Sequence, residues 1–236
     1  MAAKPGTKLR LLDFGAGKGR LASAILDADE LQTRPPSDWL DYVAFDHDAK
    51  DSEPCRNAIA RIYGNSDRRY FNESRELLAA FDEETFDCAM MCNVFHEIPP
   101  ADWLGLFEKH GAIVKLLKKD GFLLIVEDMQ IPVGEKPHQR GFLVLDTPQI
   151  KELFGLKQNE LIVHSERGGR LKAHRIPQQA LRRITHQTRN NALESVSAES
   201  RRQILALRQA EPHTRTEGCM AFGFSNLQML TWPYSN

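Results

Sequence analysis

Three glycines stand at alternate positions near the start of the chain, where a short apolar run ends. They are Gly15, Gly17 and Gly19, and Asp13 precedes the first of them by two positions. Glycines let a backbone approach a ligand without a Cβ in the way, and the amino end of a following helix offers unpaired N–H groups. The chain departs from the dinucleotide-binding fingerprint G-x-G-x-x-G, because Arg20 occupies the position of its third glycine. The carboxylate of Asp13, so close to the glycines, would repel a pyrophosphate but could accept hydrogen bonds from a cationic ligand.

Strand-like and helix-like segments alternate around and after this loop. Such alternation indicates right-handed βαβ units and a mainly parallel sheet. Residues 160–165 and 171–176 flank a Gly-Gly turn and predict a hairpin. We predict strands over residues 8–14, 41–46, 69–72, 86–92 and 122–127, and helices over residues 20–31, 52–63, 74–81, 100–117, 147–155, 178–195 and 198–210.

The loop with its preceding acid resembles motif I of the class I S-adenosylmethionine-dependent methyltransferases, acid-x-Gly-x-Gly-x-Gly. Asp46 ends the predicted second strand, where this family carries an acid that holds the ribose hydroxyls. Two carboxylate oxygens suit a vicinal diol because both hydroxyls can donate. Asp46 lies 27 residues after Gly19, and the usual run is about 20. Residues 32–39 look like a small insertion that accounts for the difference.

Later segments agree with the family in chain order, and the resemblance covers roughly residues 8–176. Asn72 follows the third strand, where the family contacts adenine, and the segment that ends at Asn93 resembles motif IV. The resemblance implies S-adenosylmethionine as the cofactor, and Asp13, Gly15, Gly17, Gly19, Asp46, Asn72 and Asn93 as its binding residues. It also implies an α/β fold, a Rossmann-like three-layer sandwich. We expect a mostly parallel seven-stranded sheet with an antiparallel C-terminal hairpin strand, and a C-terminal helical appendage.

The candidate chemical groups follow the fourth and fifth strands. A ligand crevice lies at the carboxyl ends of the strands in open α/β sheets. His96 and Glu97 stand at the end of strand four and are the candidate base or substrate contacts, with backbone binding or helix capping as the alternative. Glu127 and Asp128 end strand five, and a solvated turn is the favoured reading of that pair. The histidines lack the spacing of a metal site, so we expect none.

Charge is unevenly distributed over a chain of 236 residues with a net charge of -1. Residues 167–215 hold eleven Lys and Arg but three acids. We therefore expect a methyltransferase domain over residues 1–176 and a basic, mainly helical appendage over residues 177–236. The appendage binds nucleic acid or an acidic protein, or it docks on the acidic body. The preferred phosphate contacts are Arg182, Arg183, Arg201 and Arg202.

The composition of the chain bears on the cellular compartment in which the protein is expected. No apolar run approaches the roughly 20 residues that span a bilayer, and the start of the chain has no apolar signal core. Four cysteines without a C-x-x-C pattern are not a disulfide framework, so we expect a reducing, cytoplasmic location and no membrane partner. About eight residues precede the first predicted strand, so another segment or a partner chain is expected to supply the substrate lid.

Three functions remain open at this point. The first is methyl transfer to an oxygen or nitrogen of a small molecule, protein or nucleic acid. The second is a non-catalytic subunit of the same fold that docks a partner through the basic segment. The third, a nicotinamide-dependent oxidoreductase, is opposed by the glycine spacing.

Overall fold

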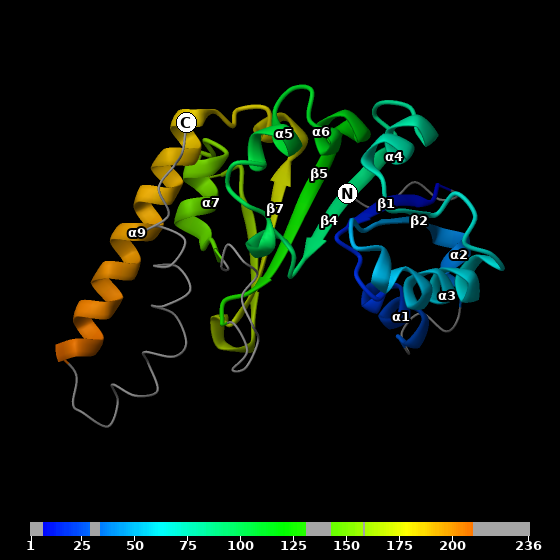
Figure 1. Ribbon diagram of the computed structural model, residues 1–236, viewed down its shortest axis with the longest axis horizontal. Coiled ribbons are helices and arrows are strands. Elements are labelled where there is room, and N and C mark those ends of the chain that lie inside the picture. Colours follow the sequence, from blue (N-terminus) through cyan, green and yellow to red (C-terminus); the bar gives the residue numbers. More distant parts are fainter. Residues whose placement is uncertain (1–6, 29–33, 131–142, 158, 210–236) are drawn as a thin grey trace.

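A seven-stranded sheet forms the centre of the computed structural model, which describes residues 7–28, 34–130, 143–157 and 159–209 (Figure 1). The strand order is β3-β2-β1-β4-β5-β7-β6. Neighbouring strands from β3 to β5 run parallel, while β7 runs antiparallel to both β5 and β6. The predicted sheet and its hairpin strand are thereby confirmed. The strands are β1 (Leu9–Phe14), β2 (Leu40–Phe45), β3 (Tyr70–Phe71), β4 (Phe86–Cys92), β5 (Leu117–Asp128), β6 (Ile162–Glu166) and β7 (Leu171–Pro177).

Helices cover both faces of the sheet and make it the middle of three layers. One face packs on α1 (Arg20–Asp27) and α3 (Ser52–Tyr63) through a cluster that includes Ala22 and Ile59. The other face packs on the remaining helices, through a cluster that includes Trp103 and Leu193. These are chiefly α4 (Ser74–Ala80), α5 (Trp103–Phe107), α6 (Ala112–Leu116), α7 (Thr147–Leu153), α8 (Gln178–Leu181) and α9 (His186–Gln209); α2 (Pro36–Trp39) is one short turn before β2. No helix in the described residues is long and apolar enough to cross a membrane.

The prediction of a single helix over residues 100–117 is wrong. The chain forms two short helices there, α5 and α6, and the backbone is extended at Glu108 and Gly111 between them. A Cβ at Gly111 would lie 2.3 Å from the carbonyl oxygen of Leu106, so a compact break forms at a residue without a side chain. Strand β5 then begins at Leu117, earlier than predicted, and Gly121 lies inside it instead of ending a helix.

The C-terminal region also differs from the prediction of two helices that meet near residue 196. The break lies instead before His186, where the amide and hydroxyl groups of Thr185 and Thr188 bond to one another and start α9. From there α9 is continuous to Gln209. Ala192, Leu193 and Val196 of α9 belong to the same apolar cluster as the sheet. The domain boundary at residue 176 stays a prediction, and residues 210–236 of the appendage lie outside the described residues.

Candidate functional site

The glycine loop leaves β1 in a conformation that excludes most side chains. The amides of Gly15 and Ala16 both donate to the carbonyl of Phe45, at 2.8 and 3.1 Å, which ties the loop to the end of β2. The φ angles of Gly15, Gly17 and Gly19 are +85°, +50° and +75°, in the left-handed region that favours glycine. A Cβ on Gly15 would meet Val94 at 2.5 Å, whereas a Cβ on Gly17 would have no neighbour within 4 Å. Gly15 is therefore needed for packing, and Gly17 borders open space.

Asp46 lies against this loop with its carboxylate already oriented. One oxygen accepts from the amide of Gly17 at 2.6 Å, and the other accepts from the amide of Asp48 at 2.8 Å. Each carboxylate oxygen has a second lone pair, so both can accept a further hydrogen bond. The amide of Asp46 donates to the carbonyl of Phe71 at 3.0 Å, which brings the following Asn72 to the same edge. The structure thus brings together the glycine loop, Asp46 and Asn72.

Asp13 lies deeper than the rest of the predicted cofactor residues. Its side chain is 2% exposed, and one carboxylate oxygen accepts from the hydroxyl of Tyr42 at 2.5 Å. Burial raises the pKa of Asp13 to about 6; the Tyr42 hydrogen bond opposes this shift, and the charge of Asp46 adds to it. The structure therefore places Asp13 beneath the loop, in the core, with Tyr42 as its partner.

Asn93 joins the ends of β4 and β5. Its amide donates to the carbonyl of Val126 at 2.8 Å, and its side-chain oxygen accepts from the amide of Asp128 at 2.9 Å. Asn93 also has a φ of +52°, which is uncommon for a residue with a side chain. Such residues cluster at binding and catalytic sites, where the surrounding structure holds them in place.

His96 and Glu127 form a buried pair at the carboxyl ends of β4 and β5. The ring Nδ1 of His96 lies 2.6 Å from Oε2 of Glu127, and the backbone amide of His96 donates to Oε1 at 3.2 Å. The two residues are 8% and 1% exposed. Since a carboxylate accepts and does not donate, the neutral ring carries its proton on Nδ1, and Nε2 is then the unprotonated nitrogen. A base held by a third group in this way is the general arrangement of an acid–base catalyst.

Glu97, the other predicted catalytic residue, stands at the exposed side of this pair. Its Oε1 lies 3.9 Å from Nε2 of His96. Glu127 was expected in a solvated turn, and the structure corrects that reading, because it is the buried partner of His96. The signal was present in the sequence: Glu127 follows Leu123 and Ile125 at alternate positions of a strand, so it must face the same apolar cluster.

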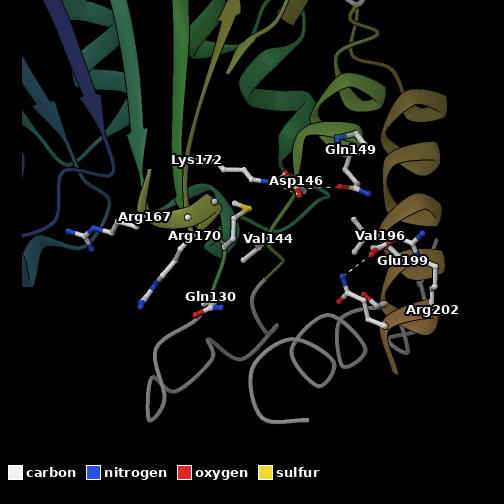
Figure 2. Close-up of a pocket in the computed structure, with 16 residues that line it drawn as sticks. Gln130, Val144, Asp146, Gln149, Arg167, Arg170, Lys172, Val196, Glu199 and Arg202 are labelled. Atoms are coloured by element: carbon white, nitrogen blue, oxygen red, sulfur yellow. Dashed lines mark hydrogen bonds and ion pairs between the residues drawn. The ribbon is translucent and has the colours of Figure 1, made fainter. Parts of the chain in front are cut away.

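A hollow of about 620 Å³ lies between the β6–β7 turn, α7 and α9 (Figure 2). Met129, two residues after Glu127, forms part of its wall, and so does Val144. The amide of Leu143, the residue before Val144, donates to the carbonyl of His96 at 3.0 Å, but neither His96 nor Glu127 is among the residues that line the hollow. The hollow could not be predicted from local sequence patterns, because its walls come from segments far apart in the chain.

The four arginines predicted to contact phosphate do not share one environment. Arg183 pairs with both oxygens of Glu160, at 2.7 and 2.8 Å, and Arg202 pairs with Glu199. Arg182 and Arg201 are exposed, without an ion pair inside the described part of the chain. Within the same residues, no group of three or more His, Cys, Asp and Glu side chains could hold a metal ion.

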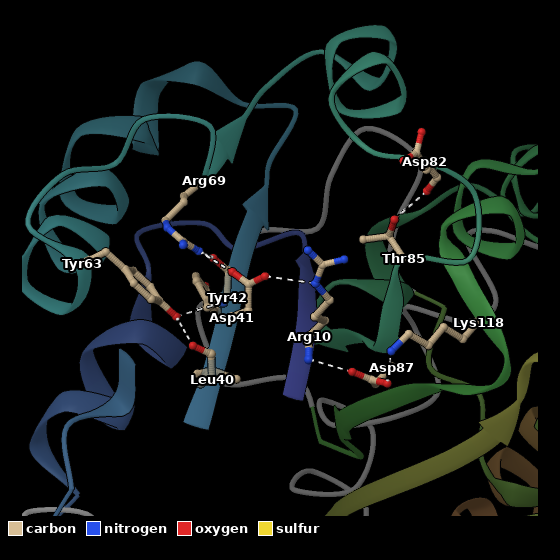
Figure 3. Close-up of polar contacts among 10 residues, drawn as sticks. All are labelled: Arg10, Leu40, Asp41, Tyr42, Tyr63, Arg69, Asp82, Thr85, Asp87 and Lys118. Carbon is tan, nitrogen blue, oxygen red and sulfur yellow. Dashed lines mark hydrogen bonds and ion pairs between the residues drawn. The ribbon is translucent and has the colours of Figure 1, made fainter. Parts of the chain in front are cut away.

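Polar groups at the opposite, amino edge of the sheet are paired with one another (Figure 3). Asp41 accepts from Arg10 at 3.1 Å and from Arg69 at 2.7 Å, and these contacts hold the pKa of Asp41 below its usual value against the effect of burial. Asp87 accepts from Lys118 at 2.6 Å and from the amide of Arg10 at 2.8 Å. These contacts join β1, β2, β4 and β5, so the amino edge has a structural role.

Comparison with known families decides the class of the protein. A family model described as a methyltransferase domain matches residues 1–188. The chain belongs to the methyltransferase-domain family. Methyl transfer is therefore the activity of its class, and the Rossmann-like methyltransferase fold is confirmed. No curated protein matches the sequence.

Solved structures with this methyltransferase fold are distant in sequence. The CurJ carbon methyltransferase is 15% identical, with a TM-score of 0.50 over 75% of this chain and 50% of its own. A phosphoethanolamine N-methyltransferase 2 from Haemonchus contortus, solved with S-adenosylhomocysteine, is 16% identical, with a TM-score of 0.43 over 92% of this chain and 44% of its own. This chain spans half or less of the first few structures it matches.

Proposed function

We propose that this protein transfers a methyl group from S-adenosylmethionine to an oxygen or nitrogen of its acceptor, with His96 as the general base. The observation that carries the proposal is the buried pair of His96 and Glu127, which stands at the ends of β4 and β5. Strand β4 lies directly beside β1, which leads into the glycine loop. A base is thus positioned one strand away from the proposed cofactor site.

The residues around the loop suit this cofactor. Gly17 borders open space, and the two oxygens of Asp46 can still accept from the two hydroxyls of a ribose. Asn72 follows β3 and Asn93 follows β4, so they lie on opposite sides of the glycine loop at the carboxyl edge of the sheet. Asn72 would contact the adenine of the cofactor, and Asn93 would contact its amino-acid part. Asp13 adds negative charge beneath the loop, which favours a cationic ligand. When bound, S-adenosylmethionine would supply a methyl group carried on a positively charged sulfur. The methyl carbon is the atom that the acceptor attacks.

The protein's own contribution to the reaction is to position the acceptor and to take its proton. Nε2 of His96 accepts the proton from the O–H or N–H of the acceptor, since Nδ1 is already bonded to Glu127. The imidazolium that results is stabilised by Glu127 on one side and by the carboxylate of Glu97, 3.9 Å from Nε2, on the other. Glu127 acts through His96 and is a positioning residue.

A carbon acceptor is the second candidate. A base matters most where the acceptor holds its proton on oxygen or on a carbon activated by a carbonyl group, and less where an amine is present as free base. The CurJ relative bears the name carbon methyltransferase, and the same histidine could take a proton from such a carbon. The atom that carries the methyl group in the product separates these cases.

The test is methyl transfer from isotopically labelled S-adenosylmethionine to a pool of small molecules, with His96→Gln beside the wild type. We expect the labelled product to form about 10²- to 10⁴-fold more slowly in the variant, the usual contribution of a general base. Cofactor affinity should stay within twofold. His164→Gln is the matched control, because His164 is exposed on β6. Equal rates for His96→Gln and wild type would overturn the role of His96, and cofactor binding without any transfer would favour the non-catalytic subunit.

A further inference from the structure

Strand β5 contains five apolar residues in succession, a pattern typical of a strand that is covered on both faces. One face is covered in this way, because Leu123 and Ile125 point into the apolar cluster under α5, α6, α7 and α8 and are 0% exposed. Phe122, Leu124 and Val126 alternate with them and therefore point to the opposite face. These three side chains are only half-buried. The sequence thus predicts a second cover, which the described helices do not complete.

This half-buried face continues across the neighbouring strands. The register places Met90 of β4, Leu124 of β5, Arg175 of β7 and Ile162 of β6 side by side in one row. Residues paired in this way point to the same face of a sheet. The rows on either side add further half-buried or exposed residues, which are Phe122, Pro177, Cys92, Val126, Ala173 and His164. We call the residues of these three rows the open face. A continuous apolar surface outside the core is typical of an interaction site.

Helices α1 and α3 cover a different part of this side of the sheet. Ala22 and Ile59 of these helices form one buried cluster with Tyr42 of β2, and Figure 1 shows α1 and α3 beside β1 and β2, away from β5 and β7. Phe122 and Leu124 only border that cluster. Parallel strands such as β4 and β5 are normally covered on both faces. The open face is therefore the part of the helical layer that the described residues leave unfilled.

The dimensions of the open face match a single helix. The face spans four strands and three rows of residues. At about 4.8 Å between strands and about 6.8 Å between rows, it measures about 14 Å in each direction. A helix of three turns is about 16 Å long and about 10 Å wide, so it would cover this surface. A stable dimer buries about 800 Å² on each partner, which is several times the area of the open face.

The charge on the open face also favours a partner other than a second copy of the chain. Arg175 stands in the middle row, and its guanidinium lies over the Phe122 ring, 4.2 Å from the ring centre. It has no ion pair within the described ranges. Two chains packed by this face would bring two Arg175 side chains together, and like charges oppose such pairing. A carboxylate would instead pair with the stacked guanidinium.

We propose that the open face binds one amphipathic helix of a partner protein, whose carboxylate pairs with Arg175. The apolar stripe of that helix packs on Leu124, Val126 and Ile162, of which Ile162 is 44% exposed in the free chain. A helix laid by its apolar side on an apolar surface is a common mode of protein recognition. The inference uses the sheet alone and does not depend on the proposed methyl transfer.

The experiment measures the binding of two synthetic helical peptides to the full chain by fluorescence anisotropy. Both peptides carry the same stripe of leucines at helical spacing, and the residues beside the stripe are Glu in one peptide and Lys in the other. We expect the Glu peptide to bind saturably, one per chain, and about fivefold more tightly than the Lys peptide. Leu124→Asn and Ile162→Asn should each raise the Kd of the Glu peptide about tenfold, because each removes apolar contact area. Arg175→Gln should abolish the preference for Glu over Lys.

Leu78→Asn is the matched control, because Leu78 is 36% exposed on α4 and lies outside the open face. Its Kd should equal that of the wild type. Thermal melts show whether each variant is folded, and Ile162 on the exposed strand β6 supplies the test if Leu124→Asn does not fold.

Three results would overturn the inference. The first is the absence of saturable binding of either peptide, or an equal loss of affinity in Leu78→Asn. The second is equal affinity of the wild type for both peptides, since Arg175 would then select no carboxylate. The third is a dimer in sedimentation experiments that dissociates in Leu124→Asn, which would identify a second copy of the chain as the occupant of the open face.

Discussion

Replacing Gly17 by valine separates the cost of the loop conformation from its role in binding. A side chain at Gly17 would meet no protein atom within 4 Å, so the substitution causes no overlap in the fold. The φ of +50° is unfavourable for any L-residue by about 1–2 kcal/mol. For a domain of this size each kcal/mol lowers Tm by about 2–4 °C, so Tm should fall by about 2–8 °C. The valine would fill the space in front of the loop and abolish cofactor binding.

Gly64→Val is the matched control for this variant. Gly64 also has a positive φ, +86°, and a Cβ there would have no neighbour within 4 Å, but it follows α3 and not the glycine loop. Thermal melts with and without S-adenosylhomocysteine provide the assay. Both variants should lose similar stability, and only Gly64→Val should keep the ligand-induced rise in Tm. A rise in Gly17→Val as large as in the wild type would refute the placement of the ligand at this loop.

Three further predictions concern other parts of the molecule. Glu127→Gln should slow methyl transfer and shift its pH profile, because the His96 imidazolium loses its buried carboxylate; an unchanged profile would contradict the positioning role. Asp13 is protonated more readily in the folded state, with a pKa of about 6 against 3.8, so its contribution to stability is complete below pH 3.8 and is lost as the pH rises through 6. Asp13→Asn should therefore gain up to about 3 kcal/mol relative to the wild type between pH 4 and pH 7.5, measured by denaturant titration at both values, and a constant difference would oppose this. Changing Arg182 and Arg201 to Glu should leave Tm unchanged and, if the basic region contacts nucleic acid, should flatten the salt dependence of filter binding; retention equal to the wild type would exclude these contacts.

Short-range patterns predicted most of the fold and the place of the glycine loop between β1 and α1. Each strand from β1 to β4 was placed within a few residues, because the apolar runs are short and end at glycine, aspartate or asparagine. The prediction of one helix over residues 100–117 was wrong, because apolar residues at helical spacing also continue across the extended backbone at Gly111. Tertiary packing decided that break, since α5 and α6 each bury one face in the same cluster.

Only part of the candidate site could be predicted from the sequence. His96 was identified from its place after β4, but its partner Glu127 lies 31 residues away and depends on the pairing of β4 with β5. Arg183 and Arg202 were counted as part of a basic stretch, and only the structure shows that Glu160 and Glu199 pair with them. Charge counts along a chain cannot show which cations are neutralised by neighbours in space.

Calorimetric titration of the wild-type protein with S-adenosylmethionine, and with NAD as the comparison, tests the central claim most directly. The glycine spacing, the oriented Asp46 carboxylate and the open space at Gly17 predict saturable binding of one S-adenosylmethionine per chain and no binding of NAD. Asp46→Ala should weaken that binding by roughly 1.5–3 kcal/mol, the scale of a charge-assisted hydrogen bond. Absence of S-adenosylmethionine binding, or tighter binding of NAD, would contradict the assignment of this edge of the sheet as a methyl-donor site.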